Sequence, residues 1–135
     1  MNLTIKKIYI IAIISTFVSL NAGESVIDLQ HHLQWQDSQE KNEDIWKMAV
    51  GYCKQLNLDS KNDWRLATSD ELKLLGKSQT LKKKFKYFEN HIYWSIEEDK
   101  EDNLNAVTVY TGNGFVSVSD KCEKNFMLCV RDLKK

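Results

Sequence analysis

The chain places the triplet Trp64-Arg65-Leu66 just ahead of a helix-start signal, and this stretch constrains the fold more than any other. The signal consists of Thr68 and Glu71, which have the spacing of a capping box. In such a box the Thr hydroxyl accepts a hydrogen bond from the Glu N–H, and the Glu carboxylate accepts one from the Thr N–H. We therefore expect a helix to begin at Thr68 and the triplet to be buried.

An arginine within a buried triplet must be paired, because an isolated charge is costly in the interior. We therefore expect carboxylates to hold Arg65 under the sheet in a structural role. The other interpretation is that Arg65 with Glu71, and Arg131 near the end of the chain, form an anion site or acid–base machinery. Trp64 and Trp94 have apolar neighbours, which favours the core over a ligand platform.

Apolar residues at helical spacing predict an amphipathic helix over residues 44–57, with Asp44 or Asn42 as its cap. The helix that begins at Thr68 is expected to end at Gly76, because glycine adopts the left-handed conformation at little cost. Leucine and phenylalanine spaced by four and three predict a third helix over residues 79–88.

The last third of the chain changes to short runs rich in β-branched and aromatic residues. These runs predict strands over residues 91–96, 105–110, 115–119 and 126–131. The loop at residues 111–114 contains Asn-Gly, which favours a tight hairpin. One or two short strands are also expected between residues 25 and 37. Helices followed by an antiparallel sheet indicate the α+β class.

The first 22 residues have the layout of a secretory signal. Lys6 and Lys7 precede an apolar block over residues 8–20, and Ala22 and Gly23 follow. This layout predicts export with cleavage after Ala22, with an uncleaved anchor as the alternative. The block is shorter than the roughly 20 apolar residues of a membrane-spanning helix, so we expect no span after cleavage. Residues 23–135 suffice for one domain.

Charge gives no indication of a nucleic-acid partner. Without the signal the chain carries 17 basic and 19 acidic residues. The lysines at 82–84 and Lys86 have acidic residues around them in the sequence, which favours a solvated helix face. We therefore expect no nucleic-acid binding.

Several motifs resemble the family named for the C-terminal domain of a Legionella collagen-like protein. That family has an Asp-Trp-Arg-Leu-Pro-Thr…Glu-Leu signature, a Trp-x-x-Ala-x-x-Tyr-Cys helix, an opening Leu-x-Trp strand, a Tyr-Trp-Ser strand and a similar closing strand. The matching segments here begin at Asp63, Trp46 (with Ala49), Leu33, Tyr93 and Cys129. Ala67 replaces the usual proline, and Asp59-Ser60 replaces a common glycine turn, so the geometry of these two loops is in question.

The family in turn resembles the C-type-lectin-like and formylglycine-generating-enzyme fold. The resemblance therefore implies an α+β, C-type-lectin-like domain with two or three helices packed on a twisted antiparallel sheet. Cys53 and Cys129 occupy the positions that lectin-like folds bridge, so the resemblance also favours this disulfide. The competing pair is Cys122 with Cys129, whose shorter loop would stabilise less, by roughly 2 against about 4.5 kcal/mol.

An acidic loop over residues 97–103 lies where lectin-like folds keep their ligand-binding loop. Carboxylates and an amide there could hold Ca²⁺ through oxygen ligands, although a solvated turn is the interpretation we favour. The ligand-binding candidates are Glu98, Asp99, Asp102, Asn103 and, in the hairpin loop, Asn113. The three histidines lack zinc-ligand spacing and no serine lies in a nucleophile elbow, so we expect no metal, no cofactor and no catalytic residue.

These features favour a periplasmic or secreted, non-enzymatic binding module for a glycan or a protein of the cell envelope or surface. The loops at 97–104 and 111–114 would present its ligand-binding groups. One alternative is an enzyme related to formylglycine-generating enzymes, which would need a reactive cysteine pair or a thiolate metal site. Another is a small periplasmic assembly or stability factor.

Overall fold

A computed structural model describes residues 24–40 and 42–134. The expected signal at residues 1–22 lies outside the described residues. Strands and helices follow in the order β1 (Ser25–Asp28), β2 (Leu33–Gln36), β3 (Glu43–Asp44), α1 (Trp46–Gln55), β4 (Arg65–Leu66), α2 (Ser69–Lys77), α3 (Gln79–Lys82), β5 (Ile92–Glu98), β6 (Asn105–Tyr110), β7 (Phe115–Asp120), β8 (Asn125–Phe126) and β9 (Cys129–Asp132). Among these helices none has the length and apolar character needed to cross a membrane.

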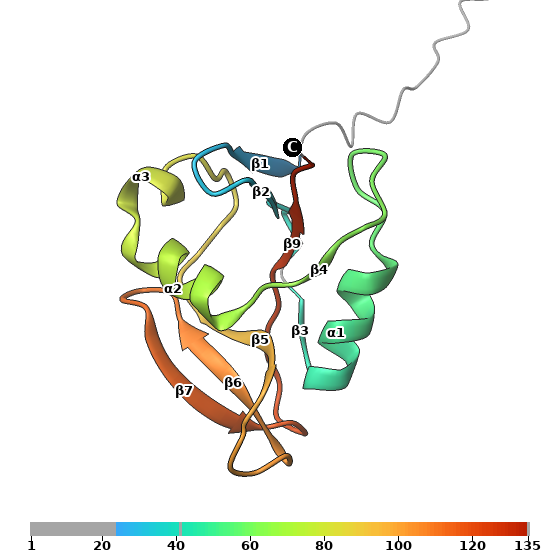
Figure 1. Ribbon diagram of the computed structural model, residues 1–135, viewed down its shortest axis with the longest axis vertical. Coiled ribbons are helices and arrows are strands. Elements are labelled where there is room, and N and C mark those ends of the chain that lie inside the picture. Colours follow the sequence, from blue (N-terminus) through green and yellow to red (C-terminus); the bar gives the residue numbers. More distant parts are fainter. Residues whose placement is uncertain (1–23, 41, 135) are drawn as a thin grey trace, which may run out of the picture.

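The strands form two sheets, ordered β1-β2-β9-β4 and β3-β8-β5-β6-β7 (Figure 1). The α+β class is confirmed, whereas the expected single antiparallel sheet is replaced by two sheets. One of them contains a parallel pairing, between β5 and β8 at Tyr93 and Phe126. A C-type-lectin-like arrangement stays a prediction.

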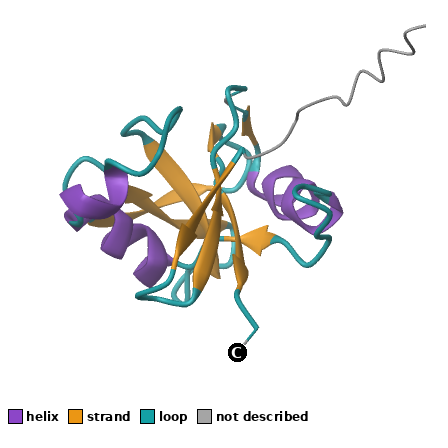
Figure 2. Ribbon diagram, turned by 90° about the horizontal axis from the view of Figure 1, so that it is seen from above, coloured by secondary structure: helices purple, strands orange, loops and turns teal. Residues whose placement is uncertain are grey.

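The helices lie on opposite flanks of the strands, with α1 on one side and α2 and α3 on the other (Figure 2). Two hydrophobic clusters fill the space between them. One contains Trp35 with Leu72 and Leu75 of α2, and the other contains Trp64 and Trp94 with the inward face of α1. Because Trp64 and Trp94 are at most 3% exposed, their expected place in the core is confirmed.

A disulfide joins Cys53 of α1 to Cys129 of β9, with the two Cα atoms 5.4 Å apart. The pairing implied by the resemblance is therefore confirmed, and Cys122 is free and exposed. Both bridged cysteines are fully buried. The bridge ties the first helix to the last strand across a sequence separation of 76 residues.

The predicted strand over residues 126–131 is wrong, because the chain there passes from one sheet to the other. Phe126 pairs with Glu43 and Tyr93, whereas Cys129 pairs with Leu66. The N–H of Met127 donates to the Asn42 carbonyl instead of continuing the strand. Two strands of different sheets thus share one continuous β-type run of sequence.

The expected cap of the first helix is also wrong. Ile45 is the N-cap residue and makes no side-chain capping bond, whereas Asp44 lies in β3 and accepts from the Ile45 N–H at 2.8 Å. The N–H of Trp46 instead donates to the Lys121 carbonyl, 3.1 Å away. A distant backbone group therefore satisfies the start of α1.

The capping box of α2 is confirmed. The Thr68 hydroxyl accepts from the Glu71 N–H at 3.1 Å, and the Glu71 carboxylate accepts from the Thr68 N–H at 2.8 Å. Gly76, however, lies inside the helix and does not end it. Glycine is required there because an added Cβ would lie 2.8 Å from the Gly114 nitrogen.

The third helix is shorter than predicted and ends at Lys82. Phe85 and Phe88 lie beyond it and still pack against the core. The Asp37 carboxylate accepts from the N–H groups of Lys86 and Tyr87 at 2.6 and 2.9 Å. These bonds hold the segment in a non-helical course, although its apolar spacing is helical.

The two departures from the family motifs are accommodated locally. Asp59 and Ser60 take positive φ angles of 52° and 58°, the conformation that a glycine turn would supply. Ala67 donates its N–H to the Leu128 carbonyl at 3.1 Å, a bond that a proline could not make.

Candidate functional site

Arg65 is held by carboxylates, as expected, but unlike Trp64 and Leu66 it is not buried, because its side chain is 27% exposed. Its guanidinium donates to both oxygens of Glu71 at 2.7 and 2.9 Å and to Asp132 at 3.1 Å. Burial alone would raise the pKa of Glu71, but hydrogen bonds from Arg65 and Thr68 outweigh it and hold that pKa below its ordinary value. Glu71 thus serves both the capping box and the ion pair, which joins α2 to β4.

Arg131 has a comparable structural environment. It is 5% exposed and donates to Asp63 at 2.6 and 3.2 Å and to the Gln34 side-chain oxygen at 2.7 Å. The hydrogen bond from Arg131 is the main cause that lowers the pKa of Asp63. Both arginines are therefore paired with carboxylates of the protein.

The acidic loop uses its carboxylates on its own chain. Glu98 pairs with Lys121 at 2.9 Å. Asp99 accepts from the Glu101 N–H at 3.3 Å and Asp102 from the Leu104 N–H at 3.0 Å. Asn103 is exposed. Within residues 24–40 and 42–134, no group of three or more His, Cys, Asp or Glu could hold a metal ion.

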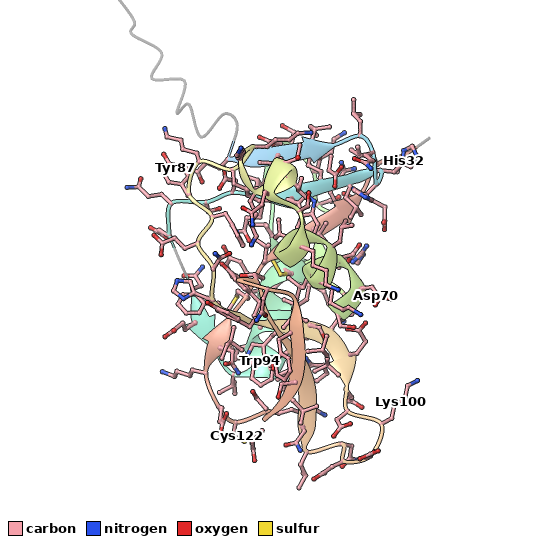
Figure 3. The ribbon with its side chains drawn as sticks, turned by 90° about the vertical axis from the view of Figure 1, so that its left-hand side faces the viewer. His32, Asp70, Tyr87, Trp94, Lys100 and Cys122 are labelled. Atoms are coloured by element: carbon pink, nitrogen blue, oxygen red, sulfur yellow. A yellow bond between two sulfur atoms is a disulfide. The ribbon has the colours of Figure 1, made fainter. Side chains whose placement is uncertain are left out.

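The two loops expected to present a ligand lie at opposite ends of β6 (Figure 1). Asn113, which accepts from the Phe115 N–H at 2.9 Å, is therefore not brought together with Glu98, Asp99, Asp102 and Asn103. Figure 3 places Lys100 of the acidic loop at the end of the molecule where Cys122 lies. The structure thus offers no single surface that includes all five candidates.

A different surface brings exposed apolar groups together at the hairpin end of the five-stranded sheet. Ile92, Tyr110 and Phe115 are direct cross-strand neighbours on β5, β6 and β7. Their side chains are 47%, 43% and 65% exposed. Three neighbouring exposed apolar side chains on a rigid sheet are a stronger indication of recognition than scattered ones.

A hollow of about 290 Å³ adjoins Ile92 and Tyr110. Its remaining lining residues are polar, charged or aromatic: Glu43, Asn90, His91, Lys124, Asn125 and Phe126. The Asn125 side-chain nitrogen is buried and has no hydrogen-bond partner among the described residues. An unpaired buried amide costs about 1–3 kcal/mol, so a partner such as an ordered water or a group bound in the adjoining hollow would stabilise it.

Neighbouring side chains hold the aromatic residues of this hollow in place. The His91 ring stacks on Phe126 with centroids 3.9 Å apart, and Glu89 contacts the His91 Nε2 at 3.3 Å. The Tyr110 ring lies close over Gly112, because a Cβ there would come within 2.5 Å of the ring. The absence of a side chain at Gly112 therefore lets the ring take its position.

Sequence reasoning did not identify this site. Its residues come from β3, β5, β6 and β8 and from the segments beside β5 and β8. The predicted hairpin contained a signal for this site. Strands 105–110 and 115–119, joined by a tight turn, put Tyr110 opposite Phe115. Two large apolar side chains that are neighbours on a surface indicate a recognition site.

The family model of the Lcl C-terminal domain matches residues 24–131 of the sequence. No curated protein matches the chain. The match spans most of the sequence and agrees with the family that the motifs resemble. The chain therefore belongs to the Lcl C-terminal domain family, which suggests an extracellular or surface-associated domain.

Proposed function

We propose that the chain is an exported, non-enzymatic binding module that holds a glycan in the hollow beside Ile92 and Tyr110. The observation that carries this proposal is the combination of an exposed aromatic ring with an unpaired buried amide in one concave site. The disulfide and the family are consistent with the extracellular location that such a role requires.

The lining favours a saccharide on chemical grounds. Sugar rings carry an apolar C–H face and a rim of hydroxyls, so they suit a flat aromatic surface beside hydrogen-bonding groups. Tyr110 supplies the ring, Asn90 and Asn125 supply amides, and Glu43 and Lys124 supply one charge of each sign. Small-molecule sites combine apolar surface with a few such orienting polar groups.

The non-enzymatic part rests on how the reactive groups are used. The enzyme alternative needs a reactive cysteine pair or a thiolate metal site, but Cys53 and Cys129 are joined to each other in a disulfide. The carboxylates nearest to the two arginines, Glu71 and Asp63, are held in ion pairs. None of these groups is left to act as a nucleophile or a general base.

A protein ligand is the second candidate, favoured by the exposed side chains of Ile92 and Phe115. Aliphatic and phenylalanine side chains contribute apolar contact area but no hydroxyl pairing. They therefore fit a protein surface better than a sugar.

The test is a glycan array probed with chain recovered from the periplasm of expressing cells. Tyr110→Ala should weaken binding to any hit at least tenfold, whereas Tyr110→Phe should retain it. Leu29→Ala is the matched control, because Leu29 is 73% exposed and does not line the hollow. Equal binding by wild type and Tyr110→Ala would refute this site. A protein partner captured without any glycan hit would favour the second candidate.

A further inference from the structure

Strand β7 is an open edge of the five-stranded sheet with apolar side chains exposed on both faces. Among the residues that the structure describes, it pairs with β6 alone. Phe115, Val116 and Val118 are 65%, 40% and 45% exposed. Natural proteins protect such edges with lysine, proline or a bulge. Within Phe115–Asp120 there is no lysine or proline, and its pairing with β6 runs without a register shift.

We propose that β7 pairs with β7 of a second copy of this chain, antiparallel and centred on Ser117. Residues that oppose each other across such a pair must point to the same face of the sheet. Centring on Ser117 places Val116 opposite Val118 of the second copy, and by symmetry Val118 opposite its Val116. Each exposed valine is then covered by the other.

Neighbouring registers are poorer. Centring on Val116 would place Val118 opposite Gly114 of the second copy, and centring on Val118 would place Val116 opposite its Asp120. Each of these registers leaves one valine in each copy without an apolar partner. The register at Ser117 is therefore the one that pairs both valines.

Charge complementarity identifies the second copy as the occupant. In this register Asp120 lies opposite Gly114 of the second copy. The Lys77 side chain lies beside Gly114, since a Cβ on that glycine would be 3.2 Å from the Lys77 Cγ and Cε. Asp120 points to the same face as Val116. The partner of Val116 on β6 is Val109, which packs in the core cluster that contains Leu72 and Leu75 of α2.

The pairing therefore brings the Asp120 carboxylate of each copy toward the Lys77 ammonium of the other, once at each end. Both side chains are exposed in the single chain; the Asp120 Oδ1 atom accepts from the Cys122 N–H at 2.8 Å, which leaves the Oδ2 atom for the Lys77 ammonium. A two-fold axis perpendicular to the sheet also turns the same sheet face of both copies toward one side. The assembly is independent of the proposed glycan function, although it would make any binding at the hollow bivalent.

Cysteine scanning tests the register directly. In a Cys122→Ser background, Ser117→Cys places two thiols opposite each other, at a Cα separation of about 4.5–5.5 Å that suits a disulfide. We expect Ser117→Cys to give a covalent dimer on a non-reducing gel after mild oxidation. Ser119→Cys is the matched control and should stay monomeric, because its thiols would lie four residues apart in register. Equal crosslinking at both positions, or none at Ser117→Cys, would overturn the proposal.

Sedimentation of chain recovered from the periplasm tests the charge pair without new cysteines. Wild type should dimerise with rising concentration, and Val118→Lys should remain monomeric. Lys77→Glu should raise the dimer Kd at least tenfold. The double variant Lys77→Glu/Asp120→Lys should return the Kd to the wild-type value, and Lys47→Glu on α1 should leave the Kd unchanged. A monomeric wild type, or equal effects of Lys77→Glu and Lys47→Glu, would refute the pairing. Circular dichroism confirms that each variant is folded.

Discussion

The backbones of Gly76 and Gly114 meet with no room for a side chain between them. A Cβ on Gly76 would lie 2.8 Å from the Gly114 nitrogen and 2.9 Å from its Cα atom. Helix α2 and the hairpin loop must therefore separate if that atom is added. We predict that Gly76→Ala lowers the free energy of unfolding by about 1–3 kcal/mol, measured by urea denaturation.

Gly51→Ala is the control for this substitution. Gly51 is also inside a helix, but apart from its chain neighbours and the backbone of its own helix, no atom of the described residues lies within 4 Å of an added Cβ. Alanine should therefore raise the free energy of unfolding by about 0.5–1 kcal/mol through helix propensity. If both variants were stabilised alike, the close approach at Gly76 would be disproved.

The second prediction concerns the disulfide. Cys129→Ser should lower the free energy of unfolding by about 4.5 kcal/mol on the chain-entropy model, because it opens a bridge of sequence separation 76. Urea denaturation measures the change, and Cys122→Ser should leave stability within about 0.5 kcal/mol of wild type. A thiol titration of the native, unreduced protein should find one reactive thiol, from Cys122. Two or more would contradict the bridge.

The third prediction follows from the lowered pKa of Glu71. An acid whose pKa is lower in the folded state binds fewer protons there than in the unfolded chain. Its contribution to stability is therefore present above the ordinary pKa of 4.5 and is lost as pH falls through the folded-state pKa. We expect Glu71→Gln to reduce stability at pH 7 and to flatten its decline below pH 4.5.

Glutamine keeps the capping-box geometry with Thr68, so this variant isolates the charge pair with Arg65. The measurement is the free energy of unfolding from urea denaturation at several pH values between 7 and 3. Parallel curves for wild type and Glu71→Gln would show that the ion pair contributes nothing that depends on pH.

The fourth prediction concerns Ser60, whose φ of 58° is costly for a residue with a Cβ. Ser60→Gly should raise the free energy of unfolding by about 0.5 kcal/mol, since the relief of strain exceeds the entropy that glycine adds to the unfolded chain. Ser119→Gly in β7 is the contrast and should be destabilising, because glycine weakens a strand interior. A loss of stability in Ser60→Gly would contradict the strain argument.

Local sequence signals predicted the parts of the fold that local chemistry decides. The capping box of Thr68 and Glu71 was confirmed in both of its hydrogen bonds, and the need to pair a guanidinium beside buried Trp64 and Leu66 predicted the carboxylates on Arg65. The disulfide was implied by the resemblance, because spacing alone left Cys122 as a possible partner.

Tertiary pairing decided the parts that were missed. Residues 126–131 have β-type composition throughout, so nothing local marks the point between Phe126 and Cys129 where the chain changes sheets. The hollow escaped prediction for a similar reason, since its lining extends from Glu43 to Phe126 in sequence. No periodicity within one segment can report a site that four strands assemble.

The last prediction concerns Gly112, where a substitution should affect ligand binding more than stability. Gly112→Ala would place a Cβ 2.5 Å from the Tyr110 ring, which must then move. Because a ring at the end of a side chain gives way more cheaply than backbone, the free energy of unfolding should change by less than about 1 kcal/mol, unlike in Gly76→Ala.

The affinity of Gly112→Ala for a glycan identified on the array should nevertheless fall severalfold, as the Tyr110 ring leaves the hollow. Titration of that glycan into wild type, Gly112→Ala and Tyr110→Ala should show losses at both positions that are not additive, because both substitutions remove the same aromatic surface. Additive losses would mean that Gly112 acts on binding by a route other than the ring.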